Sequence, residues 1–167
     1  MSELSLSEST VERLQPFIGV KEGPSPWFTV TQDAVTAFAD LTQDHNFIHI
    51  DPERAARETH FGGTIAHGFY TVSMLSYLFG LVPHADDNPF RDAVTMVNYG
   101  FNKLRFVSPV KIGQEIRVVR TLNSARPKGP DWVEIAYDVV VEINGESRPA
   151  LKAEWLVLMI CGPGKAE

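Results

Sequence analysis

The 167-residue sequence is poor in cysteine, in positive charge and in long apolar segments. Its single cysteine, Cys161, has no intrachain partner, so an internal disulfide is impossible and a reducing, cytoplasmic location is expected. The 15 basic residues are outnumbered by 21 acidic ones, which gives a net charge of -6. A general nucleic-acid-binding protein needs a basic surface, so we expect no nucleic-acid partner.

Export, membrane and nucleotide signals are also missing. The first residues, MSELSLSESTVERLQ, do not form the basic region and apolar run of a secretory signal. The most apolar stretch, residues 65–82, includes His67, Thr71 and Ser73, which makes it too polar for a membrane helix. Because the sequence has no GxGxxG and no Walker motif, we expect no nucleotide cofactor.

What remains is typical of one globular domain. Hydrophobic residues make up 44% of the chain and charged residues 22%. We expect a single domain over residues 25–161, an N-terminal extension over 1–24 and a C-terminal tail over 162–167. The start of the extension is expected to be loosely attached, with a short helix from Ser9 to Leu14.

Helix signals dominate the first half. A short strand over residues 27–30 is followed by Thr31, a good N-cap, and by apolar residues at helical spacing over about three turns. Asp51-Pro52 begins a second helix that is expected to end near Thr59. Residues 43–50, called the strap here, form a non-helical connection between these helices. Residues 65–82 are apolar almost all round, which predicts a helix covered on every side, ended by Pro83 and the polar tract 84–91.

From residue 92 the pattern changes to alternation of apolar and polar residues. It predicts strands over 94–106, 114–124, 133–143 and 151–159. Asn144-Gly145 between the last two runs predicts a hairpin with a type I′ turn. The fold class is therefore α+β, with an antiparallel sheet wrapped around a central apolar helix.

The strap holds the residues best suited to chemistry. Asp44 and His49 are a candidate acid–base pair that shares one water, and Asn46 is placed to orient one of them. An alternative is purely structural, with Asp44 in an Asx turn and Asn46 as a left-handed loop residue. A metal site that joins His45 and His49 to His60 or His67 needs a helix that this segment does not favour, so no metal is expected.

His67-Gly68 opens the apolar helix. Backbone N–H groups in a first helical turn have no internal partner and lie at the positive end of the helix dipole. The Gly68 N–H is therefore a candidate oxyanion donor. The alternative is that Gly68 only permits close packing and that His67 is a core histidine.

Three blocks resemble one family. Residues 39–52 read ADLTQDHNFIHIDP, residues 61–69 read FGGTIAHGF and residues 98–106 read NYGFNKLRF. The first contains the D-x-N-x-x-H pattern of the MaoC-like, R-specific enoyl-CoA hydratases (hydratase 2), and the second resembles that family's next block. The third is similar to a block of its NodN-like branch, and the blocks occur in family order.

The resemblance implies a hot dog fold, usually dimeric, and the reversible syn addition of water to a trans-2-enoyl thioester of CoA or acyl carrier protein. It implies no cofactor. Carried onto this chain, Asp44 is the base toward water, His49 donates the proton to C2 and Asn46 supports the strap. The Gly68 N–H polarises the thioester carbonyl.

Two positions depart from the family pattern, since Gln43 and Phe47 stand where glycine and proline are common. They put the strap conformation and the shape of the acyl pocket in question. The residues expected to line the substrate pocket are Phe47, His67, Phe69, Tyr70, Met74 and Tyr99. The alternative role for the apolar and aromatic residues of this set is core packing. Lys103, Arg105, Arg126 and Lys128 are candidates for a phosphate, and their alternative role is a solvated surface.

Two other functions remain open at the level of sequence. Many hot dog proteins are acyl thioesterases, and some proteins keep a fold without turnover. A non-catalytic thioester-binding subunit is therefore the alternative outside enzymes. The presence of both Asp44 and His49 favours the hydratase.

Overall fold

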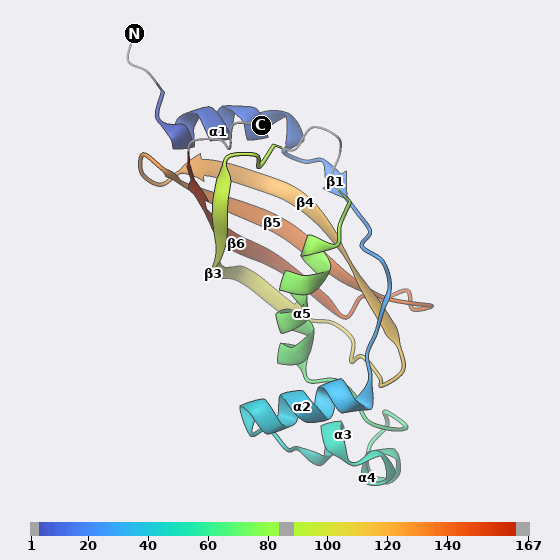
Figure 1. Cartoon of the computed structure of the whole chain (residues 1–167). Coiled ribbons are helices and arrows are strands. Elements are labelled where there is room, and N and C mark those ends of the chain that lie inside the picture. The colour runs from blue at the N-terminus through green and yellow to red at the C-terminus, as the bar shows by residue number, and fades with distance from the viewer. Residues whose placement is uncertain (1–3, 84–88, 163–167) are drawn as a thin grey trace.

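The computed structural model describes residues 4–83 and 89–162, arranged as one curved antiparallel sheet with a helix against it (Figure 1). The predicted tail beyond residue 162 and most of the tract 84–91 lie outside these residues. The elements in chain order are α1 (Leu6–Leu14), the 3-10 helix η1 (Gln15–Phe17), β1 (Lys21–Glu22), β2 (Phe28–Thr29), α2 (Gln32–Thr42), α3 (Phe47–Ile50), α4 (Pro52–Glu58), α5 (Gly68–Gly80), β3 (Ala93–Phe106), β4 (Glu115–Pro127), β5 (Trp132–Ile143) and β6 (Leu151–Cys161).

The four long strands that the alternation of apolar and polar residues predicts are confirmed. The six-stranded sheet has the order β1-β4-β5-β6-β3, and β2 pairs with β4 as well. The hairpin of β5 and β6 is also confirmed, but its predicted two-residue turn is wrong. Gly145 has a positive φ of 77°, whereas Asn144 is not among the positive-φ residues, and the strands are joined by residues 144–150. A type I′ turn requires positive φ at both residues, so this sequence makes a longer loop.

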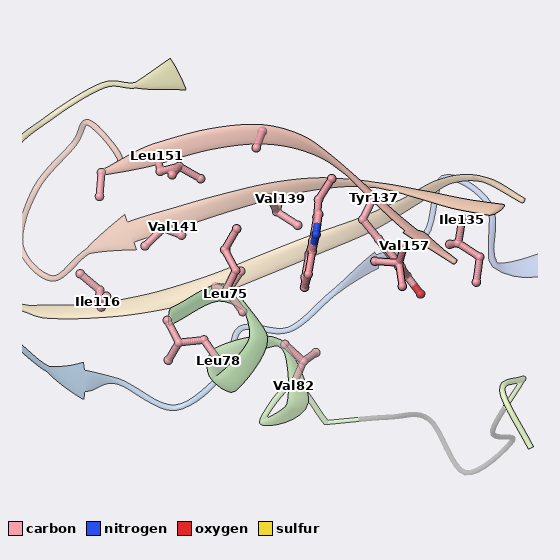
Figure 2. Close-up of a cluster of buried hydrophobic side chains, with 14 of the residues drawn as sticks. Leu75, Leu78, Val82, Ile116, Ile135, Tyr137, Val139, Val141, Leu151 and Val157 are labelled. Atoms are coloured by element: carbon pink, nitrogen blue, oxygen red, sulfur yellow. The ribbon is translucent and has the colours of Figure 1, made fainter. Parts of the chain in front are cut away.

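The core lies between α5 and the concave side of the sheet. Figure 2 shows Leu75 between the helix and the strands near Val139, with Leu78 and Val82 further along the helical segment and Val141 on the same side of the sheet. All five side chains are buried in the same hydrophobic cluster. Burying each such side chain contributes about 1.5–3 kcal/mol, so this layer fixes α5 on the sheet.

Two details of α5 differ from the sequence-based expectation. The helix begins at Gly68 rather than at Ile65, because Ile65 is extended and forms a β-bridge with Lys111. The helix is also not covered on every side, since Phe69 is 69% exposed and Tyr77 is 53% exposed. The sequence could not separate the sheet-facing side from the exposed one because both are apolar.

The helices α2 and α4 begin where their capping residues predict, whereas α1 begins at Leu6 rather than at the expected Ser9. The Thr31 side chain accepts a hydrogen bond from the Ala34 N–H at the start of α2, and the Asp51 side chain accepts one from Arg54 at the start of α4. The strap is not wholly irregular, however, because residues 47–50 form the short helix α3.

The N-terminal extension packs against the sheet, in contrast to the expected loose attachment. Helix α1 has a capping box formed by Ser5 and Glu8, and its residues Ser7, Thr10 and Leu14 are buried. Figure 1 shows α1 lying across the end of the sheet that is far from α2, α3 and α4. The later part of the extension supplies β1, which pairs with β4.

Among the described residues, no helix is both long enough and apolar enough to cross a bilayer. Cys161 is a free, buried thiol, and burial raises its pKa.

Candidate active site

His49 is held in one orientation by the chain segment that precedes α5. Its Nδ1 donates a hydrogen bond to the Ile65 carbonyl at 2.7 Å, and the Ile65 N–H donates in return to the Ile48 carbonyl at 3.0 Å. Since a carbonyl can only accept, the proton of the neutral imidazole is on Nδ1. The Nε2 atom of His49 therefore carries a free lone pair.

Asp44 and His67 complete a cluster around His49. The His67 Nε2–H donates to the Asp44 backbone carbonyl at 3.0 Å and lies 4.0 Å from the Asp44 carboxylate. The rings of His49 and His67 stack with centroids 3.7 Å apart and an interplanar angle of 27°. His67 is buried, whereas the Asp44 side chain is 57% exposed. The cluster therefore presents its carboxylate to solvent and its imidazoles to the interior.

The surroundings of His49 favour its neutral form. Burial lowers the pKa of His49, and the hydrogen bond to Ile65 opposes this shift. The nearby His67 ring lowers the pKa further, while the negative charge of Asp44 raises it. The net direction is downward, because removing the imidazolium from water costs more than its neighbours return. His49 is thus available as a proton acceptor near neutral pH.

The spacing of the cluster suits one bridging water. A carboxylate oxygen of Asp44, a ring nitrogen of His49 and a ring nitrogen of His67 all lie within 4.8 Å of one another. Two hydrogen bonds of about 2.8 Å that meet at a tetrahedral water place their partners about 4.6 Å apart. Asp44 and His49 can therefore hold the same water molecule.

The same cluster is a poor metal site. Each imidazole already donates one N–H to a backbone carbonyl, and the remaining nitrogen of His67, Nδ1, is buried. Only Asp44 and His49 then offer lone pairs to a common point. Catalytic zinc sites use three protein ligands, so this donor set suits water better than a metal ion.

Asn46 acts on the backbone of the strap. It is the N-cap of α3, and its side-chain oxygen accepts a hydrogen bond from the Ile48 N–H at 3.3 Å. This hydrogen bond fixes the point at which α3 begins after α2 has ended, and α3 carries His49. The other histidine of the strap, His45, points to the surface and contacts Asp40 at 2.9 Å.

Two supporting residues were missed by the sequence analysis. Gln32 donates a hydrogen bond to the His49 carbonyl at 2.7 Å and accepts one from the Thr64 hydroxyl at 2.6 Å. It therefore ties α3 to the segment that orients the His49 ring. Thr64 lies in a quoted motif block, but nothing in the sequence distinguishes Gln32 from an ordinary first-turn residue.

Gly68 and His49 line one cavity. The cavity has a volume of about 400 Å³ and is lined by His49, Ile65, Ala66, Gly68, Phe69, Thr71, Phe106, Val107, Ser108, Pro109, Val110 and Ala150. Gly68 is the first residue of α5, so its N–H belongs to the turn that lacks intrahelical partners. The residues contributed by 106–110 and Ala150 come from distant parts of the sequence and were not predicted.

Among the other predicted aromatic residues, Phe69 lines this cavity and the remaining three lie elsewhere. Phe47 lies under the Arg54 guanidinium, which is 4.1 Å from the ring centroid. Tyr70 is a core residue. Tyr99 accepts a hydrogen bond from Lys128 Nζ at 2.8 Å and lines a separate pocket with Ser73 and Ser76 of α5.

The basic residues Lys103 and Arg105 are not brought to the cluster within this chain. They pair across the sheet with Glu154 and Lys152, and all four side chains line a shallow depression on the sheet. The neighbouring Ala153 is buried toward the core, so this depression lies on the side of the sheet that faces away from α5. A phosphate-binding role remains a prediction for these residues.

Comparison with known proteins places the chain in a family. A family model described as a MaoC like domain matches residues 13–142. The chain belongs to the MaoC-like dehydratase family. Nodulation protein N of Rhizobium leguminosarum bv. viciae, a relative of this MaoC-like chain, is 43% identical over 164 residues, which cover 98% of the chain and 96% of that protein.

One further relative and one solved structure are also similar to this MaoC-like protein. The 3-hydroxyacyl-thioester dehydratase Z of Mycobacterium tuberculosis is 39% identical over 148 residues, which cover 89% of the chain and 94% of the relative. The solved structure of an (R)-hydratase from A. caviae involved in PHA biosynthesis superposes with a TM-score of 0.61 at 26% identity, covering 84% of this chain and 94% of that one. The hot dog fold implied by the sequence resemblance is confirmed.

Proposed function

We propose that this protein is a hydratase/dehydratase that interconverts trans-2-enoyl and (R)-3-hydroxyacyl thioesters. The observation that carries the proposal is the Asp44–His49 pair, spaced for one water, with His49 also lining the cavity that begins at Gly68. The names of the dehydratase and hydratase relatives support the reaction class. The thioester is carried by CoA or by acyl carrier protein.

In the hydration direction the water is held between the Asp44 carboxylate and the His49 Nε2. His49 takes one proton from the water as its oxygen forms a bond to C3 of the enoyl group, and the C2=C3 electron pair moves toward the thioester carbonyl. The imidazolium then returns the proton to C2. One water thus supplies both the hydroxyl group and the hydrogen from one face, which is a syn addition.

This division of labour differs in one step from the one implied by the sequence resemblance. His49 remains the proton donor to C2, but it also replaces Asp44 as the base toward water. The reason is the hydrogen bond to Ile65, which leaves the lone pair of neutral His49 on Nε2. Asp44 accepts the second hydrogen bond of the water and stabilises the transient imidazolium.

Gly68 is assigned to the carbonyl of the substrate. Negative charge develops on the thioester oxygen when the C2=C3 electrons shift, and a backbone N–H at a helix N-terminus stabilises such charge. The Gly68 N–H opens α5 on the wall of the cavity that His49 also lines. A carbonyl bound there brings C2 and C3 of the same substrate next to the water.

We also propose that the protein is a homodimer that forms along β3. This 14-residue strand is the edge of the sheet, and among the described residues its only strand partner is β6. Its exposed large hydrophobic residues are Val94, Met96, Val97, Tyr99, Phe101 and Phe106. A long apolar edge strand left open would promote aggregation, so a second copy is the partner that fits it.

The experiment that tests the reaction compares Asp44→Asn and His49→Gln with the matched surface variants Asp40→Asn and His45→Gln. Turnover of a short enoyl-CoA is followed by the loss of the enoyl thioester absorbance, and chiral analysis identifies the 3-hydroxy product. We expect each site variant to lose about 10²–10⁴-fold in kcat, because each removes a group that handles the water or its proton. The surface variants, which alter only an exposed contact, should match wild type.

Three outcomes would contradict the proposal. Wild-type activity in both site variants would exclude the Asp44–His49 mechanism. Release of free thiol without hydration would identify a thioesterase. Binding of the thioester without turnover by wild-type protein would identify a non-catalytic subunit.

A further inference from the structure

His67 contacts both residues that are assigned to the water. Its ring stacks on His49, and its Nε2–H donates to the Asp44 carbonyl. Phe38 of α2 also packs against it, with ring centroids 5.2 Å apart. His67 is therefore the side chain that joins α2, the strap, α3 and the start of α5.

The hydrogen bonding of His67 indicates that the imidazole is kept for its N–H. With the proton on Nε2, the lone pair is on Nδ1, which is buried and has no hydrogen-bond partner among the described residues. A buried polar atom without a partner costs free energy, so it calls for an explanation. A phenyl ring would fill the same space without that cost but would not donate to Asp44.

We propose that His67 is a positioning residue: its Nε2–H fixes the Asp44 backbone, so that the Asp44 carboxylate keeps the distance from His49 that one water spans. This inference rests on the proposed hydratase function. Misplacing a reacting group by about 1 Å can cost about 10²-fold in rate, so a contact of this kind acts on turnover.

The stack also affects the charge of His49. The two rings are 3.7 Å apart, and the charge of a protonated His67 lowers the pKa of His49. Asp44 and His67 are the charged or titratable groups that act on His49. Asp44 favours the imidazolium, and His67 opposes it.

Two substitutions separate the contacts of His67. His67→Phe keeps a ring between Phe38 and His49 but removes the donor to Asp44. His67→Gln keeps an N–H at the position of Nε2 but removes the stacked ring. We expect His67→Phe to lose about 100-fold in kcat with little change in KM, and His67→Gln to recover most of that loss. In both variants the acid limb of the pH profile should move to higher pH, because the opposing imidazole is gone.

Wild-type kcat in a folded His67→Phe variant would overturn the inference, and so would equal losses in the two variants. If His67→Phe does not fold, the tautomer of His67 in wild-type protein decides. Long-range ¹H–¹⁵N NMR should show the proton on Nε2, and a proton on Nδ1 would overturn the inference because Asp44 would then have no donor. This measurement needs no turnover. Absence of hydration by wild-type protein would refute the proposed function and still leave the placement of His67 to be decided by NMR.

Discussion

The proposed chemistry of this protein depends on which nitrogen of His49 carries the proton. The Ile65 carbonyl accepts from Nδ1 and so directs the lone pair of the neutral ring to Nε2. Burial keeps the ring neutral by lowering its pKa. A histidine with the opposite tautomer would present an N–H to the water and could not accept its proton.

At the residue scale, the pH dependence of kcat/KM in the Asp44→Asn variant tests how Asp44 acts on His49. In the proposed mechanism His49 acts in its neutral form, so kcat/KM should fall as the pH drops through its pKa, which lies below the usual 6.5. Asp44 raises this pKa by its negative charge. Removing the charge should therefore move the acid limb of the residual activity to lower pH.

The residual rate of Asp44→Asn measured from pH 4.5 to 8 checks this expectation, with Asp40→Asn as the control whose acid limb should match wild type. A shift of the limb to higher pH would show that the group that titrates is not His49, or that Asp44 does not act on it through its charge.

At the scale of elements, the start of α5 and the end of β3 meet at the cavity. A Cβ added to Gly68 would lie 2.9 Å from Cε1 of Phe106, closer than real side chains come. The Phe106 ring is 45% exposed, so it has room to turn away. The lack of a side chain at Gly68 therefore sets the shape of the cavity. A side chain added there would displace the Phe106 ring rather than residues of the core.

We expect Gly68→Ala to fold with wild-type stability within about 1 kcal/mol, because alanine favours helices and Phe106 can move. We expect kcat/KM to fall by at least about tenfold, since the displaced ring enters the cavity next to the carbonyl site. Adding Phe106→Leu should recover part of the loss, because the two residues are in contact and their effects are coupled. Thermal unfolding and steady-state kinetics of the single and double variants measure both effects. Equal loss with and without Phe106→Leu would show that the contact is irrelevant to activity.

At the scale of the whole molecule, the described residues leave one edge of the sheet protected and the other edge open. On the β4 side, β1 and β2 both pair with β4 and cover its outer edge in two places. On the other side β3 presents a long row of apolar side chains. This asymmetry is the reason that the proposed contact between copies of the chain is assigned to β3.

We expect Val97→Lys to weaken the dimer, since it puts a charge in the middle of this edge. Val97 is 43% exposed in the single chain. Sedimentation velocity over a range of concentrations should show a dimer for wild type and dissociation for the variant. Leu41→Lys on α2, where the leucine is 82% exposed, is the control and should remain dimeric. A monomeric wild-type protein would refute the β3 interface.

The sequence alone determined the elements that depend on local signals. The period-two runs gave the four long strands, and the caps at Thr31 and Asp51 gave the starts of α2 and α4. The three motif blocks gave the family and placed Asp44 and His49 on one segment. These signals are local because backbone propensity, capping and side-chain alternation act between residues a few positions apart.

The tertiary structure decided how the residues of the candidate site are arranged. Ile65 fixes the tautomer of His49 from 16 positions away, and His67 reaches back 23 positions to the Asp44 carbonyl. Phe106 approaches Gly68 from a different element. The tertiary structure also keeps Lys103 and Arg105, which the sequence predicts to bind a phosphate, away from the cluster of Asp44, His49 and His67. Such contacts arise when distant segments pack on one core, and no pattern within a short window of sequence encodes which of them will meet.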